Sequence, residues 1–99
     1  MNIKNASSLK EAFSKFKTWK KSRTPLKLTV LPKDETPEIF VGEIASVDEE
    51  SFLIGFAVSK TRSYLPPIDL GDASFVLGKF VLEARRPSGD VLTCEELRP

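Results

Sequence analysis

The sequence contains no histidine and only one cysteine among its 99 residues. Without histidine the chain cannot build Ser-His-Asp or Cys-His catalytic groups, imidazole metal ligands or a histidine pH switch. The single cysteine, Cys94, cannot close a disulfide within the chain, and one thiol without imidazoles leaves no zinc site of the usual kind. A lone cysteine also fits a reducing compartment, so we expect a cytoplasmic protein.

Closely spaced glycines and long apolar runs are absent too. The five glycines stand singly, without the spacing of a phosphate-binding loop. The longest apolar stretch, FLIGFAV at residues 52–58, is far shorter than the roughly 20 residues of a membrane-spanning helix. The first ten residues contain no apolar segment typical of a secretory signal. We therefore expect no enzymatic activity, no cofactor, no metal site and no membrane partner.

The composition that remains is ordinary for a folded chain, with 40% hydrophobic and 29% charged residues. Its length suffices for one modest hydrophobic core, so we expect a single domain over residues 1–99.

Residues 8–22 have the pattern of an amphipathic helix. Ser8 and Glu11 have the spacing of a capping box, which predicts the helix start. Pro25 disfavours helical geometry in the preceding residue and predicts the end. The apolar side chains recur at helical intervals and should form one buried stripe: Leu9, Ala12, Phe13, Phe16 and Trp19.

From residue 26 onward the apolar period changes from helical to alternating. Gly42 stands within the second of the expected strands and suggests a bend or a bulge there. Pro66 and Pro67 forbid a central strand in residues 60–72, although parts of this segment could pair at an edge. We expect residues 26–97 to form a mainly β domain, a small, strongly bent, five-stranded antiparallel barrel. The helix should cap its open end. A two-layer helix-on-sheet domain is the alternative. The expected strands are 26–31, 39–47, 51–59, 73–85 and 91–97.

The segment GEIASVDEESFLI at residues 42–54 resembles the first motif of the Sm-like (SH3-like) small barrels. Four residues stand where that motif has a glycine, two apolar residues and an aspartate: Gly42, Ile44, Val47 and Asp48. The resemblance implies a bent hairpin and the barrel order of strands. The RNA-contacting asparagine of the family is replaced by Phe52, and the arginine–glycine pair of its second motif by Leu77 and Gly78. The RNA-contact residues of the family therefore do not carry over.

Charge is divided unequally along the chain. Residues 1–27 hold eight Lys and Arg against one acid, a net +7, whereas residues 28–99 have a net charge of −6. One interpretation is that one flank of the helix and the segment after it bind phosphates. The candidates are Lys10, Lys17, Lys21, Arg23 and Lys27.

Other interpretations of these lysines remain open. They suit a solvated helix face near the negative end of the helix dipole, and this is the interpretation we favour. They could also pair with acidic loops of a neighbouring subunit, such as residues 47–50, in a salt-sensitive assembly. A helix lying on a membrane surface is less favoured, because the helix has a core to pack against.

Two smaller features of the sequence also bear on binding. The acidic residues Asp48, Glu49 and Glu50 are expected at a solvated hairpin tip rather than in a metal site. A second binding loop is possible at Lys60, Arg62 and Tyr64.

These patterns predict a non-catalytic binding or assembly module that associates with itself as a homo-oligomer. The apolar strands at residues 52–58 and 75–84 are candidates for pairing between subunits. The alternative is sequence-tolerant RNA or DNA binding through the basic helix. No particular protein partner can be read from the sequence.

Overall fold

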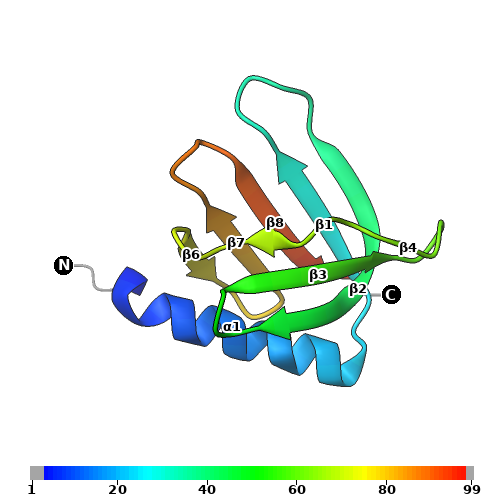
Figure 1. Ribbon diagram of the computed structural model, residues 1–99, viewed down its shortest axis with the longest axis horizontal. Coiled ribbons are helices and arrows are strands. Elements are labelled where there is room, and N and C mark those ends of the chain that lie inside the picture. The colour runs from blue at the N-terminus through cyan, green and yellow to red at the C-terminus, as the bar shows by residue number, and fades with distance from the viewer. Residues whose placement is uncertain (1–3, 98–99) are drawn as a thin grey trace.

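The computed structural model describes the backbone of residues 4–97 and the side chains of residues 9–97. One helix precedes a set of short strands that curve around a single core (Figure 1). The elements are α1 (Lys4–Ser22), β1 (Leu26–Leu31), β2 (Glu38–Asp48), β3 (Leu53–Val58), β4 (Ser63–Tyr64), β5 (Ile68–Asp69), β6 (Ser74–Leu77), β7 (Val81–Arg85) and β8 (Val91–Glu96).

The strands form one antiparallel sheet in the order β4-β3-β2-β1-β8-β7-β6, with β5 paired to β3 beside that path. The predicted mainly β, antiparallel architecture with one helix is confirmed. The prediction of five strands is wrong, because the sheet in residues 4–97 has eight strands, and in place of the predicted barrel this sheet is not closed. The expected strand at 73–85 is split by a turn in which Gly78 N–H donates to Val81 C=O (2.8 Å). The proline-containing segment adds β4 and β5 at the edge of β3, as the sequence had allowed.

The helix begins at Lys4 rather than at the predicted Ser8. No glycine or proline interrupts the chain between them, so nothing local stops the helix from extending toward the N-terminus. Ser8 therefore lies inside the helix and does not cap it. The predicted end at Ser22 is confirmed.

The aromatic face of α1 closes the open side of the curved sheet. Phe13, Phe16 and Trp19 are buried, as their spacing predicts, and α1 packs against β6 and β2 (Figure 1). Trp19 Nε1–H donates a hydrogen bond to Glu96 Oε2 (2.8 Å), which satisfies the polar atom of the indole. The large apolar area of these rings makes the helix an integral part of the core.

Gly42 marks a close approach between strands rather than a bulge. A Cβ atom added at Gly42 would lie 1.8 Å from the carbonyl oxygen of Ala57 on β3, so no other residue fits there. The irregularity in the β2–β3 ladder falls between Ile44 and Ser46 instead. The irregularity therefore lies at least two positions after the glycine at which the sequence predicted it.

Both strand segments considered for pairing between subunits have neighbours within this chain. The outer edge of β3 pairs with β4 and β5. In addition, Leu65 N–H donates to Phe56 C=O in β3 (3.0 Å), and Leu70 N–H donates to Phe52 C=O just before β3 (2.9 Å). The terminal strand β6 lies against α1. Protection of edge strands in this way disfavours edge-to-edge association.

Candidate functional site

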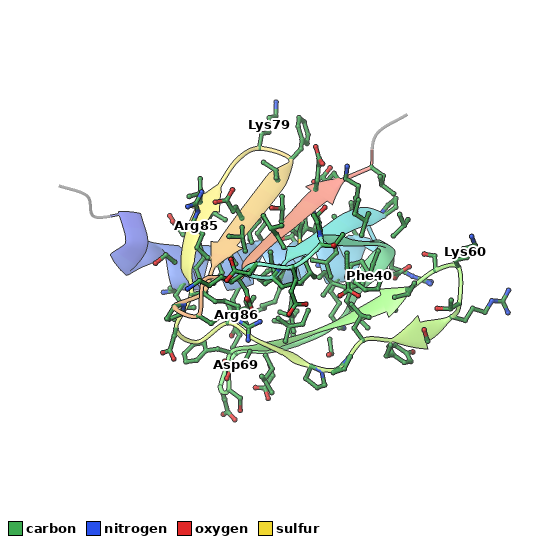
Figure 2. The ribbon with its side chains drawn as sticks, turned by 90° about the horizontal axis from the view of Figure 1, so that it is seen from above. Phe40, Lys60, Asp69, Lys79, Arg85 and Arg86 are labelled. Carbon is green, nitrogen blue, oxygen red and sulfur yellow. The ribbon has the colours of Figure 1, made fainter. Side chains whose placement is uncertain are left out.

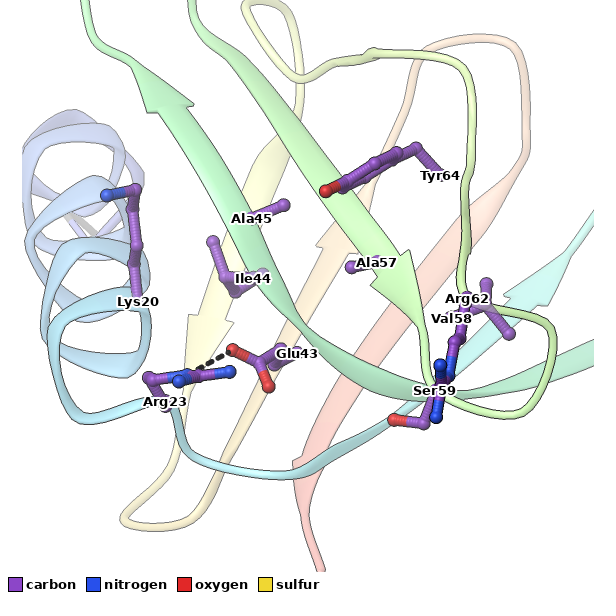
Figure 3. Close-up of a pocket in the computed structure, with 10 residues that line it drawn as sticks. All are labelled: Lys20, Arg23, Glu43, Ile44, Ala45, Ala57, Val58, Ser59, Arg62 and Tyr64. Atoms are coloured by element: carbon purple, nitrogen blue, oxygen red, sulfur yellow. Dashed lines mark hydrogen bonds and ion pairs between the residues drawn. The ribbon is translucent and has the colours of Figure 1, made fainter.

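A surface pocket lies between the C-terminal end of α1 and the strands β2, β3 and β4 (Figure 3). Its volume is about 430 Å³. One wall is formed by Lys20 and Arg23, the opposite wall by Arg62 and Tyr64, and the floor by small side chains of β2 and β3 that include Ala45 and Ala57. We call it the arginine pocket.

Both arginines of the arginine pocket have a left-handed backbone conformation. Arg23 and Arg62 each have φ of 53°. In this region the Cβ of an L-residue approaches the following carbonyl oxygen, at a cost of roughly 1–2 kcal/mol that glycine avoids. Backbone strain of this kind is found preferentially at functional sites.

Arg23 occupies the position after the helix end where glycine is usual. Thr24 N–H donates to Trp19 C=O (3.1 Å) and Arg23 N–H donates to Lys20 C=O (3.2 Å). These are the two bonds of a Schellman motif, whose left-handed residue is commonly glycine. The motif turns the chain from α1 into β1 and directs Arg23 toward the pocket (Figure 3).

Arg62 occupies the corresponding position of a β-hairpin. It is the last residue of the turn between β3 and β4, where hairpin loops frequently place a left-handed glycine. Thr61 and Ser63 on either side share a hydrogen bond between their hydroxyl oxygens (2.6 Å), which tightens the turn. The chain therefore carries arginine at two separate positions where backbone geometry favours glycine.

Tyr64 presents its ring to solvent and lines the same pocket as these cations. It is 74% exposed, although it belongs to a strand. Its cross-strand partner on β3 is Ala57, whose small side chain covers little of the ring (Figure 3). An exposed aromatic ring next to cations suits a ligand that carries both a flat apolar group and negative charge.

The balance of charge in the arginine pocket is positive. Its charged residues are three cations, Lys20, Arg23 and Arg62, and one carboxylate, Glu43. Arg23 Nε lies 3.2 Å from Glu43 Oε1, with 80% of the arginine side chain and 32% of the glutamate side chain exposed. Within residues 9–97, neither Lys20 nor Arg62 forms an ion pair. Two cations are thus available to an anionic ligand without breaking a salt bridge.

The structure separates the five residues predicted to bind phosphate. Lys27 lies on the outer face of β1, where its Nζ is 3.7 Å from Glu95 Oε1. Lys17 Nζ is 3.1 Å from Glu49 Oε2. Lys10 and Lys21 also lie along α1, and Arg23 alone of the five lines the arginine pocket. That these five residues bind phosphate therefore stays a prediction.

Two of the three residues of the predicted second binding loop line the arginine pocket. Arg62 and Tyr64 line the arginine pocket, whereas Lys60 points outward from the tip of the turn (Figure 2). Lys20 and Glu43 were missed by the sequence reasoning. The signal for Lys20 was its place in the last turn of the predicted helix, close in sequence to Arg23.

Other chemistry considered from the sequence finds little support in the described residues. Burial raises the pKa of the Cys94 thiol to about 12, which keeps it protonated and unreactive. Asp48 Oδ1 accepts hydrogen bonds from the N–H groups of Glu50 and Ser51 (3.0 and 3.2 Å), as expected of a hairpin tip. No group of three potential ligand side chains in the described residues could hold a metal ion. Residues 4–97 contain no helix of the length and apolarity needed to span a bilayer.

No protein-family model, curated protein or solved structure matches this chain.

Proposed function

We propose that this chain is a non-catalytic binding module that holds single-stranded nucleic acid in the arginine pocket with little regard to sequence. The observation that carries the proposal is the meeting of Arg23, Arg62 and Tyr64 on one pocket. The two arginines keep left-handed backbone positions where glycine would stabilise the fold. Asp34 and Phe52 share this backbone conformation outside the pocket, so the support for a ligand comes from the convergence of the two arginines with Tyr64.

The chemistry of each group fits a nucleotide chain. The guanidinium groups present planar donors that match phosphate oxygens, and Lys20 adds a point charge. The exposed ring of Tyr64 offers a stacking surface for a base, and every base has a face that can stack. A base that stacks there must be unpaired and splayed from its neighbours, so the pocket favours a single strand over a duplex.

The proposal predicts a moderate dependence on salt. Each phosphate contact with a single strand contributes a slope of about −0.7 to log K against log salt. Two or three contacts should therefore weaken binding roughly 7- to 18-fold between about 50 and about 200 mM salt. Fluorescence anisotropy of a labelled single-stranded oligonucleotide, titrated with protein at both concentrations, measures this directly.

A matched pair of variants locates the site. Arg62→Glu should reduce affinity at least tenfold at about 50 mM salt. Lys60→Glu changes charge by the same amount two residues away, outside the pocket, and should have a smaller effect. Equal losses in the two variants would mean that the loop acts through its net charge alone, and no binding by the unmodified protein would refute the proposal.

Self-association is a second candidate, supported by a different surface. Residues 38–40 of β2 extend beyond the end of β3 and pair with β1 alone. Beside them Leu31, Ile39 and Val41 are 43%, 61% and 43% exposed. We propose a second copy of this chain as the occupant of this surface, because an exposed apolar edge must be covered or paired. Sedimentation velocity over a range of protein concentrations should show a dimer or larger species that Ile39→Lys dissociates. A monomer at all concentrations would reject this candidate.

The kinship with Sm-like barrels also stays a hypothesis. Neither proposal depends on it, because the RNA-contacting residues of that family have no counterparts here, and Arg62 and Tyr64 lie outside the motif that carries the resemblance.

A further inference from the structure

A groove continues from the arginine pocket along α1. Lys20 lines both, and the groove has a volume of about 690 Å³. One wall is formed by Lys17, Lys20 and Lys21, and the other by the hairpin tip at residues 48–50, which we call the acidic turn. In this groove, which we call the lysine groove, the lysine wall therefore faces carboxylates of the same chain.

One carboxylate of the acidic turn contacts the lysine wall directly. Glu49 Oε2 lies 3.1 Å from Lys17 Nζ. Glu49 also lines an adjoining small pocket together with Lys10. The ionic pairing that the sequence suggested between subunits thus occurs within one subunit, on the flank that was predicted to bind phosphate.

This ion pair has little to do with holding the fold. The side chains of Lys17 and Glu49 are 57% and 54% exposed, and exposed pairs of this kind add at most about 1 kcal/mol. The turn is shaped instead by Asp48, which accepts two backbone hydrogen bonds. Glu49 can therefore leave Lys17 without disturbing the turn.

We infer that the lysine groove is a second phosphate subsite of the same ligand path, in which Glu49 occupies the place of a phosphate until nucleic acid displaces it. The inference rests on the proposed function of the arginine pocket. Lys17 lines the groove and Arg23 lines the arginine pocket, so the two cations belong to different parts of the path. A single strand that lies in the arginine pocket is led into the groove through Lys20, which belongs to both.

Glu49→Gln tests this inference, because it removes the carboxylate that pairs with Lys17, keeps the size of the side chain and leaves Asp48 and Glu50 in place. The variant should bind a labelled single-stranded oligonucleotide roughly 3- to 10-fold more tightly at about 50 mM salt, since a phosphate then reaches Lys17 without displacing a carboxylate. Its slope of log K against log salt should match that of the unmodified protein, because both make the same phosphate contacts. Glu35→Gln in the loop between β1 and β2 is the matched control, because it changes net charge equally on an exposed residue outside the groove.

A second variant separates the lysine groove from a general charge effect. In the Glu49→Gln background, Lys17→Ala should abolish the gain in affinity and make the slope shallower by about 0.7, because one phosphate contact is lost. A gain that survives Lys17→Ala, or that Glu35→Gln reproduces, would overturn the inference. Binding by the unmodified protein with no change in Glu49→Gln would overturn the inference and leave the arginine pocket intact, whereas no binding by any variant would overturn both proposals.

Discussion

The arginine pocket leads to an unusual prediction, that removing a binding side chain should stabilise the protein. In Arg62→Gly the left-handed backbone, with φ of 53°, no longer carries a Cβ. Relief of that strain contributes roughly 1–2 kcal/mol, and the greater freedom of glycine in the unfolded chain offsets about 0.5–1 kcal/mol of it. The net gain should be about 0.5–1 kcal/mol, or about 2–8 °C in melting temperature for a domain of this size.

The same substitution should weaken nucleic-acid binding. One phosphate contact is lost, so the slope of log K against log salt should become shallower by about 0.7, and affinity at about 50 mM salt should fall roughly 3- to 10-fold. Differential scanning calorimetry and fluorescence anisotropy on the same preparation measure the two effects. Opposite signs are expected because, under the proposed function, Arg62 serves a ligand at the expense of the fold.

Lys60→Gly is the matched control for this experiment. Lys60 belongs to the same turn and is exposed, but it is not among the residues with positive φ. Glycine there should lower stability by about 0.5 kcal/mol and leave binding nearly unchanged, because only the entropy of the unfolded chain is altered. If Arg62→Gly also lowered the melting temperature, the strain argument would fail. If its affinity were unchanged, Arg62 would not belong to the binding surface.

Three further predictions concern binding, packing and the thiol. Tyr64→Ala should weaken oligonucleotide binding roughly 5- to 100-fold by loss of base stacking, whereas Tyr64→Phe should bind normally in the same anisotropy assay; equal losses would assign the effect to the hydroxyl. Gly42→Ala should destabilise the fold by about 3 kcal/mol in urea denaturation, because the added Cβ would lie 1.8 Å from the Ala57 carbonyl oxygen. An unchanged denaturation midpoint would contradict the register between β2 and β3. Cys94, with its pKa raised to about 12, should react with a disulfide reagent at pH 8 only as fast as the chain opens, and rapid labelling of native protein would contradict its burial. Because folding raises this pKa, the stability contributed by the neutral thiol should decline as pH rises from about 8.5 toward 12.

The helix and its buried face were readable from the sequence, apart from the helix start. The intervals between Phe13, Phe16 and Trp19 are set by the helical repeat, so a pattern within one turn predicts which side is buried. The end at Ser22 was equally local, because it depends on the proline that follows. The start was predicted wrongly because the capping-box spacing at Ser8 and Glu11 is also compatible with the interior of a helix.

The sequence predicted that residues 26–97 form β-strands, but not how those strands are arranged. Alternating apolar residues predicted strands correctly, yet residues 73–85 read as one strand and form two. Alternation on either side of the Gly78 turn is the same whether the chain continues straight or folds back. A barrel was predicted from the number of bent strands, whereas closure depends on whether the two edge strands of the sheet pair, and within residues 4–97 the edge strands β4 and β6 do not.

What the sequence by itself determined is the range of chemistry and the local structure. The absence of histidine, the single cysteine and the helical stripe depend only on residue types and on contacts within a few positions. The tertiary structure alone decided which charges meet. It placed Glu49 against Lys17 and brought Arg23 to the same pocket as Arg62 and Tyr64, about forty residues later in the chain. Strand register and the packing of α1 set these neighbours, and both result from the burial of the whole core rather than from any local pattern.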